Sequence, residues 1–176
     1  MSTAHPYRRP AAILAQPDSA TAQRRLIDFA RSLLAQGLRV QGLIQETRRE
    51  AGRKTAMELV EIDSGKRFSI KQNLGQSASC QVDVQGVADA TQCLRRALAE
   101  RPDLVVVNKF SHLESEGQGL AHEMLALMAE EIPVLTTVAP EYRDDWERFT
   151  GGLAVVLNAE DAAIRAWWSE GRPGPS

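Results

Sequence analysis

Short apolar runs alternate with polar turns and helical patterns along most of the chain. A continuous apolar run of four to seven residues is typical of a strand buried on both faces, as in a parallel sheet. Such runs, some with one or two polar positions, predict five strands, at residues 11–15, 38–44, 104–107, 132–138 and 151–157. Because helical patterns separate most of them, the repeat is that of β-α units on one parallel sheet.

The intervening segments carry apolar residues at three- and four-residue spacing, which is the period of a helix with one buried face. This spacing predicts helices at about 21–36, 84–100, 119–130, 142–149 and 161–169. Gly37 follows the first of them and is expected to cap its C-terminus.

One segment interrupts the β-α rhythm. Residues 46–54 are expected to form a polar loop, and residues 56–62 alternate as in a half-buried strand. The sequence from Asp63 to Lys66 is a hairpin turn signal, with a returning strand at 67–70. The fold class is therefore three-layer α/β with a mostly parallel sheet and a β-hairpin insertion. We expect a single domain at 11–170, with flexible ends at 1–10 and 171–176.

The composition of the chain argues against several classes of binding partner. The chain has 176 residues, 43% of them hydrophobic, and its formal charge is −2, so no global field attracts nucleic acid or anionic lipid. No segment resembles a signal peptide or a membrane span. Cys80 and Cys93 have neither disulfide-framework nor zinc-ligand spacing. We expect a cytoplasmic protein that does not bind nucleic acid or insert in a membrane, and Cys93 is expected to be a small buried hydrophobe.

In open α/β sheets ligands bind outside the carboxyl ends of the strands, so the turns at that edge are the candidate sites. The first turn, 16–23, lies where a Walker A loop would hold phosphate. That loop needs glycines and a lysine, and the chain has neither between Leu14 and Gly37. A helix N-terminus still attracts anions. The candidate ligands there are Asp18, Ser19, Thr21 and Arg24, although these residues could equally serve only to cap the helix.

The second turn, expected at 108–117, holds most of the reactive side chains. Asn108 occupies the place of a Walker B carboxylate, and Lys109 is the fixed positive charge. Glu114 and Glu116 are the candidate bases or counter-ions. The spacing of these carboxylates with the nearby histidines matches no standard metal site, so no metal is expected. The hydroxyls of Thr136 and Thr137, at the end of a further strand, could line the same edge, and Thr136 is a weaker candidate ligand.

The order of these segments resembles a known family. The residues that carry the resemblance are the strings 107–110 (Val-Asn-Lys-Phe) and 114–119 (Glu-Ser-Glu-Gly-Gln-Gly), together with 36–45, 73–75 with Cys80, and 132–136. They resemble a bacterial family of proteins of unknown function that is related to small P-loop nucleoside triphosphatases and is found near molybdate-uptake and nitrogen-fixation genes. The resemblance implies a P-loop-like topology with a degenerate P-loop, and it covers residues 10–170.

Three functions remain open. The leading hypothesis is a domain that binds a small oxyanion, such as molybdate or phosphate, or a nucleotide-like ligand, with catalysis lost. The rival is an atypical nucleoside triphosphatase that uses Lys109 for charge and Glu114 or Glu116 to activate water. The third is an interaction subunit of a transporter or regulator that docks through the helix carrying Trp167 and Trp168. A homodimer is a further open partner.

Overall fold

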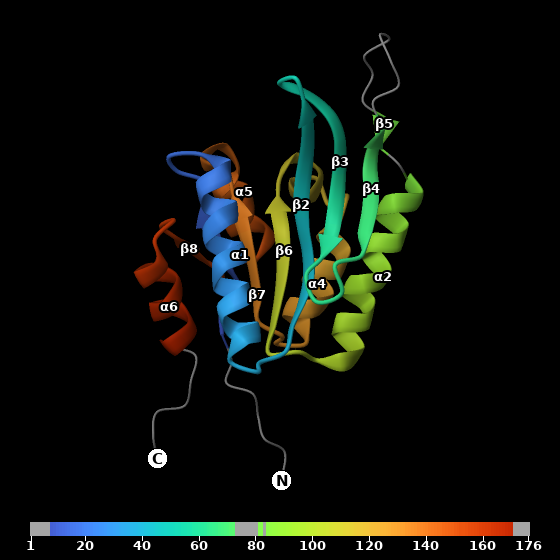
Figure 1. Cartoon of the computed structure of the whole chain (residues 1–176). Coiled ribbons are helices and arrows are strands. Elements are labelled where there is room, and N and C mark those ends of the chain that lie inside the picture. Colours follow the sequence, from blue (N-terminus) through green and yellow to red (C-terminus); the bar gives the residue numbers. More distant parts are fainter. Residues whose placement is uncertain (1–7, 73–80, 83, 171–176) are drawn as a thin grey trace.

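The computed structural model describes residues 8–72, 81–82 and 84–170, and Figure 1 shows these residues as a twisted sheet between two layers of helices. In this part of the chain eight strands follow the order β5-β4-β3-β2-β6-β7-β1-β8. The strands are β1 (Ala11–Leu14), β2 (Val40–Glu50), β3 (Arg53–Glu61), β4 (Arg67–Gln72), β5 (Gln81–Val82), β6 (Leu104–Phe110), β7 (Val134–Val138) and β8 (Val155–Leu157). The helices are α1 (Ser19–Ala35), α2 (Val84–Glu100), α3 (His112–Ser115), α4 (Ala121–Ala129), α5 (Arg143–Phe149) and α6 (Asp161–Glu170), with a 3-10 turn η2 (Pro140–Tyr142).

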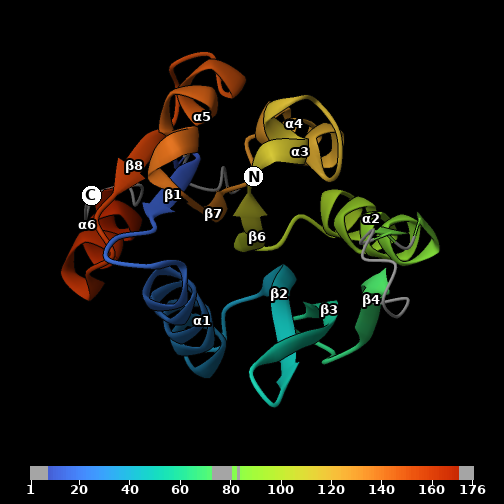
Figure 2. The ribbon, with the colours of Figure 1, turned by 90° about the horizontal axis from the view of Figure 1, so that it is seen from above.

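The four strand pairs from β2 to β8 are parallel, and the three pairs from β2 to β5 are antiparallel. Seen from above in Figure 2, α1 and α6 cover one face of the sheet, and α2, α3, α4 and α5 lie on the other. The expected three-layer, mostly parallel α/β fold is confirmed. Its hairpin insertion is larger than expected, because it contributes three antiparallel strands.

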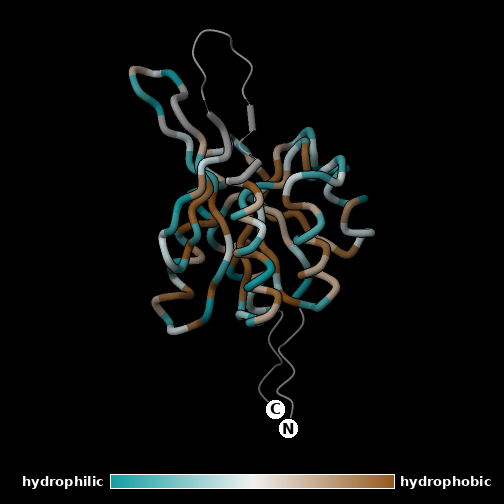
Figure 3. The backbone as a smooth tube through the Cα atoms, turned by 90° about the vertical axis from the view of Figure 1, so that its right-hand side faces the viewer, coloured by the Kyte–Doolittle hydropathy of each residue, from teal (hydrophilic) through white to brown (hydrophobic). Residues whose placement is uncertain are grey.

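Two hydrophobic cores sandwich the sheet, and β6 shows how the sequence builds both. Successive side chains of a strand point to opposite faces. Accordingly, Val105 and Val107 pack in the core beneath α2 and α4, while Leu104 and Val106 pack in the core beneath α1 and α6. Figure 3 shows the hydrophobic segments running through the body of the molecule. A strand buried on both faces has to be apolar at every position, which is why its sequence pattern is so clear.

Helix α1 follows its predicted range and ends as its sequence indicates. Gly37 has a φ of +84°, and the N–H groups of Gly37 and Leu38 donate to the carbonyls of Leu34 (3.0 Å) and Leu33 (3.1 Å). This pair of bonds is a Schellman motif, which satisfies carbonyls at the helix end. The expected C-terminal cap is confirmed.

The polar run at 46–54 is not the loop that the sequence predicts. Strand β2 continues through Glu50 and pairs with β3 around a two-residue turn, Ala51 and Gly52. Both turn residues have positive φ, 52° and 77°, which matches the twist that two-residue hairpin turns favour. The end of this hairpin is exposed, so its strands need no apolar alternation. Hydrophobicity alone therefore gives no strand signal there.

Gly42 marks the closest approach between β2 and β6. It has a φ of +127°, and a Cβ added there would lie 1.9 Å from the backbone oxygen of Val106. No other residue type fits without moving one of the two strands. Gly42 thus allows the short distance between β2 of the hairpin and β6 of the parallel part of the sheet.

The N-terminal boundary also differs from expectation. Residues 8–10 belong to the packed structure, because Arg8 is buried, its Nε donates to the Trp168 carbonyl (2.9 Å), and its guanidinium carbon lies 3.6 Å from the centre of the Trp168 ring. The rest of the expected flexible ends, 1–7 and 171–176, lies outside the described residues, as does Cys80.

Candidate functional site

The carboxyl ends of β1, β6 and β7 meet at one edge of the sheet, and a cleft of about 650 Å³ opens there. The start of α1 forms one wall of the cleft, and the hairpin of β2 and β3 forms the other. Its lining residues are Ser19, Ala20, Gln23, Gln45, Glu46, Thr47, Arg49, Met57, Asn108, Lys109 and Thr137. This edge is where ligands bind in open α/β sheets.

The side chain of Asn108 links three strands at the base of this cleft. The side chain is 4% exposed; its Nδ2 donates to Thr137 Oγ1 (2.8 Å) on β7, and its Oδ1 accepts from the Gln45 N–H (3.2 Å) on β2. A single amide thereby joins three adjacent strands. Asn108, a candidate ligand in the sequence, lines the cleft, and its hydrogen bonds also give it a positioning role.

The expected turn at 108–117 begins later than predicted. Asn108, Lys109 and Phe110 belong to β6, because Phe110 pairs with Val138 and packs against the ring of Trp146 at a centroid distance of 5.3 Å. The one-turn helix α3 follows at once. The peptide bond between Asn108 and Lys109 is cis.

Two cations face the cleft. Lys109 is exposed beside the buried Asn108, and Arg49 reaches the cleft from the hairpin. Within the described residues, no carboxylate oxygen lies within ion-pair distance of either side chain. Glu46 also lines the cleft, but Arg67 Nη1 lies 2.7 Å from its Oε2. In the described part of the chain, the cleft therefore carries two cations with no carboxylate partner, and the one acidic side chain that lines it is already paired.

The first turn is too short for a Walker A loop. Only four residues, 15–18, separate β1 from α1, whereas that loop spans eight residues with glycines at its first and sixth positions. Asp18 caps α1 by accepting from the Thr21 N–H (2.7 Å), and hydrogen bonds with Thr21 lower the pKa of its carboxyl. The carboxylate of Asp18 thus occupies the position at the N-terminus of α1 where an anionic ligand would bind.

The first-turn candidates do not all reach the cleft. Ser19 lines it, but Asp18, Thr21 and Arg24 are not among its lining residues, and Arg24 is exposed on the surface of α1. The capping interpretation holds for Asp18 and Thr21.

The two threonines on β7 have different roles. Thr136 is fully buried; its Oγ1 accepts from the Phe110 N–H (3.1 Å) and lies 3.4 Å from the Thr137 carbonyl. Thr137 instead lines the cleft and bonds Asn108. Because strand side chains alternate between faces, Thr137 rather than Thr136 lines the cleft.

The glutamates of the Glu-Ser-Glu-Gly-Gln-Gly string shape a turn. Glu114 is 7% exposed, and its Oε2 accepts from the N–H (3.2 Å) and Oγ (3.0 Å) of Ser111 in a capping box that starts α3. Glu116 lies 3.4 Å from His112 Nε2 on the exposed side of the same turn and lines no described cavity. Glu114 does line a neighbouring cavity, so its side chain can contact a ligand bound there.

That neighbouring cavity has a volume of about 440 Å³ and adjoins the cleft. Gln45, Met57, Asn108 and Lys109 line both. The remaining lining residues are Leu59, Val87, Ser111, His112, Leu113, Glu114, Gly119, Leu120, Glu141 and Tyr142. Lys109 therefore lies between two compartments, one polar and one with a partly apolar wall.

Sequence reasoning missed five polar lining residues, namely Gln23, Gln45, Glu46, Thr47 and Arg49. Four of them lie on β2, within or beside the run interpreted as a loop. The turn at Ala51 and Gly52 was the available signal, because it folds β2 and β3 into a hairpin, and Arg49 of that hairpin lines the cleft.

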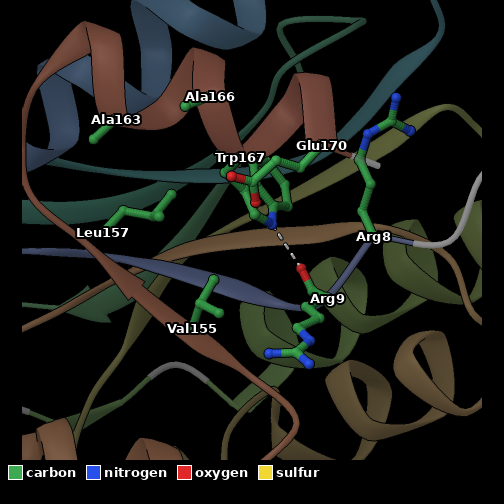
Figure 4. Close-up of a pocket in the computed structure, with 8 residues that line it drawn as sticks. All are labelled: Arg8, Arg9, Val155, Leu157, Ala163, Ala166, Trp167 and Glu170. Carbon is green, nitrogen blue, oxygen red and sulfur yellow. Dashed lines mark hydrogen bonds between the residues drawn. The ribbon is translucent and has the colours of Figure 1, made fainter. Parts of the chain in front are cut away.

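Helix α6 does not offer its tryptophans for docking. Trp167 and Trp168 are 6% and 5% exposed, and Trp168 packs edge-on against Phe29 at a centroid distance of 5.9 Å. Figure 4 shows a separate pocket of about 510 Å³ beside this helix, where Trp167 Nε1 donates to the Arg9 carbonyl (2.9 Å). Both tryptophans are core residues, so their side chains are not available to contact a partner.

Cys93 is buried, as expected, and burial raises the pKa of its thiol to about 12. Among the described residues, no cluster of three or more histidine, cysteine, aspartate or glutamate side chains could hold a metal ion. In the same part of the chain, no helix is long and apolar enough to cross a membrane.

Comparisons with known proteins match this architecture. The family model described as "Protein of unknown function (DUF2478)" matches residues 10–167. The chain is 38% identical over 164 residues to "Molybdenum import ATP-binding protein ModC 2" of Bradyrhizobium diazoefficiens, a match that covers 92% of this chain and 18% of that protein. The solution structure of a human cancer-related nucleoside triphosphatase superposes with a TM-score of 0.65 at 17% identity, covering 92% of this chain and 94% of that one.

Proposed function

The chain belongs to the DUF2478 family and has the fold of a P-loop nucleoside triphosphatase, and from this premise we propose that it binds a small oxyanion without hydrolysing nucleoside triphosphates. The observation that carries the proposal is the pair Lys109 and Arg49. These two cations line a cleft at the ligand-binding edge of the sheet, with no carboxylate partner among the described residues.

The rest of the cleft is suited to an anion. Ser19, Thr47 and Gln23 line the same space and can donate hydrogen bonds to oxyanion oxygens. A fixed positive charge in a partly enclosed cleft strengthens such bonds, since charge-assisted hydrogen bonds are about twice as strong as neutral ones.

The absence of hydrolysis rests on two features. The four-residue first turn has no glycine, and Asp18 already occupies the Thr21 N–H, so a triphosphate lacks its backbone cradle. Asn108 has both polar atoms engaged and offers Mg²⁺ no carboxylate. Glu114, the candidate base, holds Ser111 with one carboxylate oxygen.

Molybdate is the first oxyanion to test, because a relative is named as a molybdenum import protein. The chain spans only 18% of that relative, so a role beside a transporter is part of the proposal. Such a role predicts that a partner protein binds the oxyanion-bound and the oxyanion-free forms of this domain with different affinities.

The test is isothermal titration calorimetry with molybdate, tungstate, phosphate and ATP. We expect saturable binding of at least one oxyanion and at least a tenfold loss in Lys109→Ala, because a charge-assisted bond contributes ~1.5–3 kcal/mol and 1.4 kcal/mol is tenfold. The matched control is Arg24→Ala, which removes an exposed cation outside the cleft.

Saturable heat with none of the four anions would refute the proposal, as would an equal effect of the two variants. Phosphate release from ATP that disappears in Glu114→Gln would favour the nucleoside triphosphatase alternative instead.

A further inference from the structure

The cavity that adjoins the cleft has no role in binding a bare oxyanion. It lies on the far side of Asn108 and Lys109 from α1, between the sheet and the segment from α3 to α4. Its volume of about 440 Å³ falls in the range of small-molecule pockets. It shares Lys109 with the cleft, so one molecule can extend from one compartment into the other.

Part of the wall of this cavity is apolar, and polar side chains that include Lys109, His112, Glu114 and Glu141 line the rest. Met57 and Leu59 come from β3, Val87 comes from α2, and Leu113, Leu120 and Tyr142 close the opposite side. Leu113 is 39% exposed, although large apolar side chains are otherwise mostly buried here. An apolar wall of this size is suited to a flat organic ring.

One polar group in the wall lacks a partner for part of its side chain. Glu114 Oε2 accepts the two Ser111 bonds, whereas Oε1 accepts no hydrogen bond from the described residues. Oε1 lies against Gly119, where an added Cβ would come within 2.7 Å of it. This oxygen is not fully enclosed by the protein, so it is open to a ligand that donates an N–H to it.

The charges of the cleft limit the size of the anionic group. Lys109 and Arg49 supply two positive charges, which balance one phosphate dianion but not a triphosphate. The ligand is therefore expected to carry one terminal oxyanion group and a ring.

We propose that the two compartments together bind a phosphate monoester with a planar heterocyclic ring: the phosphate lies against Lys109 and Arg49, and the ring lies in the apolar cavity with an N–H donated to Glu114. This inference rests on the proposed oxyanion function and extends it to a ligand class.

Guanosine 5′-monophosphate is the probe, because its base carries a ring N–H and an amino group on one edge. Ribose 5-phosphate and inorganic phosphate are the ringless comparisons. We expect calorimetry to give at least tenfold tighter binding for guanosine monophosphate than for ribose 5-phosphate.

Two variants test the cavity itself. Val87→Phe fills it and is expected to reduce guanosine monophosphate affinity to that of ribose 5-phosphate, leaving phosphate binding unchanged. The matched control is Ala88→Phe, at the next, exposed position of α2. Glu114→Gln keeps the cap, since glutamine also serves in a capping box, and is expected to weaken guanosine monophosphate at least fivefold but not ribose 5-phosphate.

Equal affinities for guanosine monophosphate and ribose 5-phosphate would overturn the ring site while leaving the oxyanion function standing. Guanosine monophosphate binding that survives Val87→Phe would do the same. If phosphate and ribose 5-phosphate fail to bind, or bind equally well to Lys109→Ala, the oxyanion function itself fails.

Discussion

Replacing Asn108 with alanine tests whether this amide holds the floor of the cleft. The variant removes the 2.8 Å bond to Thr137 Oγ1 and the 3.2 Å bond from the Gln45 N–H. A neutral hydrogen bond contributes ~1 kcal/mol net, and leaving a buried partner unpaired adds to that cost, so we expect a loss of ~2–3 kcal/mol in unfolding free energy. With a urea m-value of ~2 kcal/mol/M, the midpoint falls by ~1 M or slightly more.

The assay is urea unfolding followed by tryptophan fluorescence and circular dichroism. A double-mutant cycle with Thr137→Val isolates the bond between the two side chains, and we expect a coupling of ~1 kcal/mol. The isosteric variant Asn108→Asp keeps acceptors for both partners but adds a negative charge beside Lys109, so it is expected to abolish oxyanion binding. A loss below ~0.5 kcal/mol in Asn108→Ala, or no coupling to Thr137, would refute the positioning role.

Three further predictions concern the scaffold. Gly42→Ala is expected to destabilise the protein by ~3 kcal/mol or more, because its Cβ would lie 1.9 Å from a β6 carbonyl oxygen; an unchanged melting temperature contradicts this. Cys93, buried with a thiol pKa of about 12, is expected to resist iodoacetamide at pH 8 in a Cys80→Ser background until the protein unfolds, and rapid native labelling contradicts this. Glu61 is buried, which opposes its ionisation, but hydrogen bonds led by that from Arg96 (2.6 Å) hold its pKa below the ordinary value. Its charged form therefore stabilises the fold above pH ~4.3 and loses this effect as the pH falls, so the stability gap between wild type and Glu61→Gln should narrow below pH ~4 in urea titrations; a gap that widens in acid contradicts it.

The parts of the fold that the sequence predicts are those where burial dictates residue type. Strand β6 needs apolar side chains on both faces, and α1 needs one apolar face with a glycine after its last turn. Both requirements leave periodic patterns. The far end of the β2–β3 hairpin, at 46–54, leaves none, because it is exposed and is defined by the positive φ angles of Ala51 and Gly52.

The candidate cleft lies at the edge of the sheet where the sequence predicts a ligand site. Lys109 and Ser19 line this cleft, whereas Thr136, which was preferred to Thr137, does not. Which of two neighbouring strand residues faces the cleft depends on the register of the strand, and a run that is uniformly polar or apolar does not reveal that register. Glu114 illustrates a second limit: a carboxylate near a lysine suggests catalysis, yet its bonds with Ser111 begin a helix.

A crystal of the full chain soaked with tungstate tests directly whether Lys109 and Arg49 form an oxyanion site at the carboxyl edge of the sheet, because the anomalous scattering of tungsten locates the ion independently of the protein density. We expect an anomalous peak in the cleft within hydrogen-bond distance of both cations, and no such peak in Lys109→Ala. A peak at Arg8 and Arg9 instead, or no peak in the cleft at saturating tungstate, would show that the two cations do not form this site.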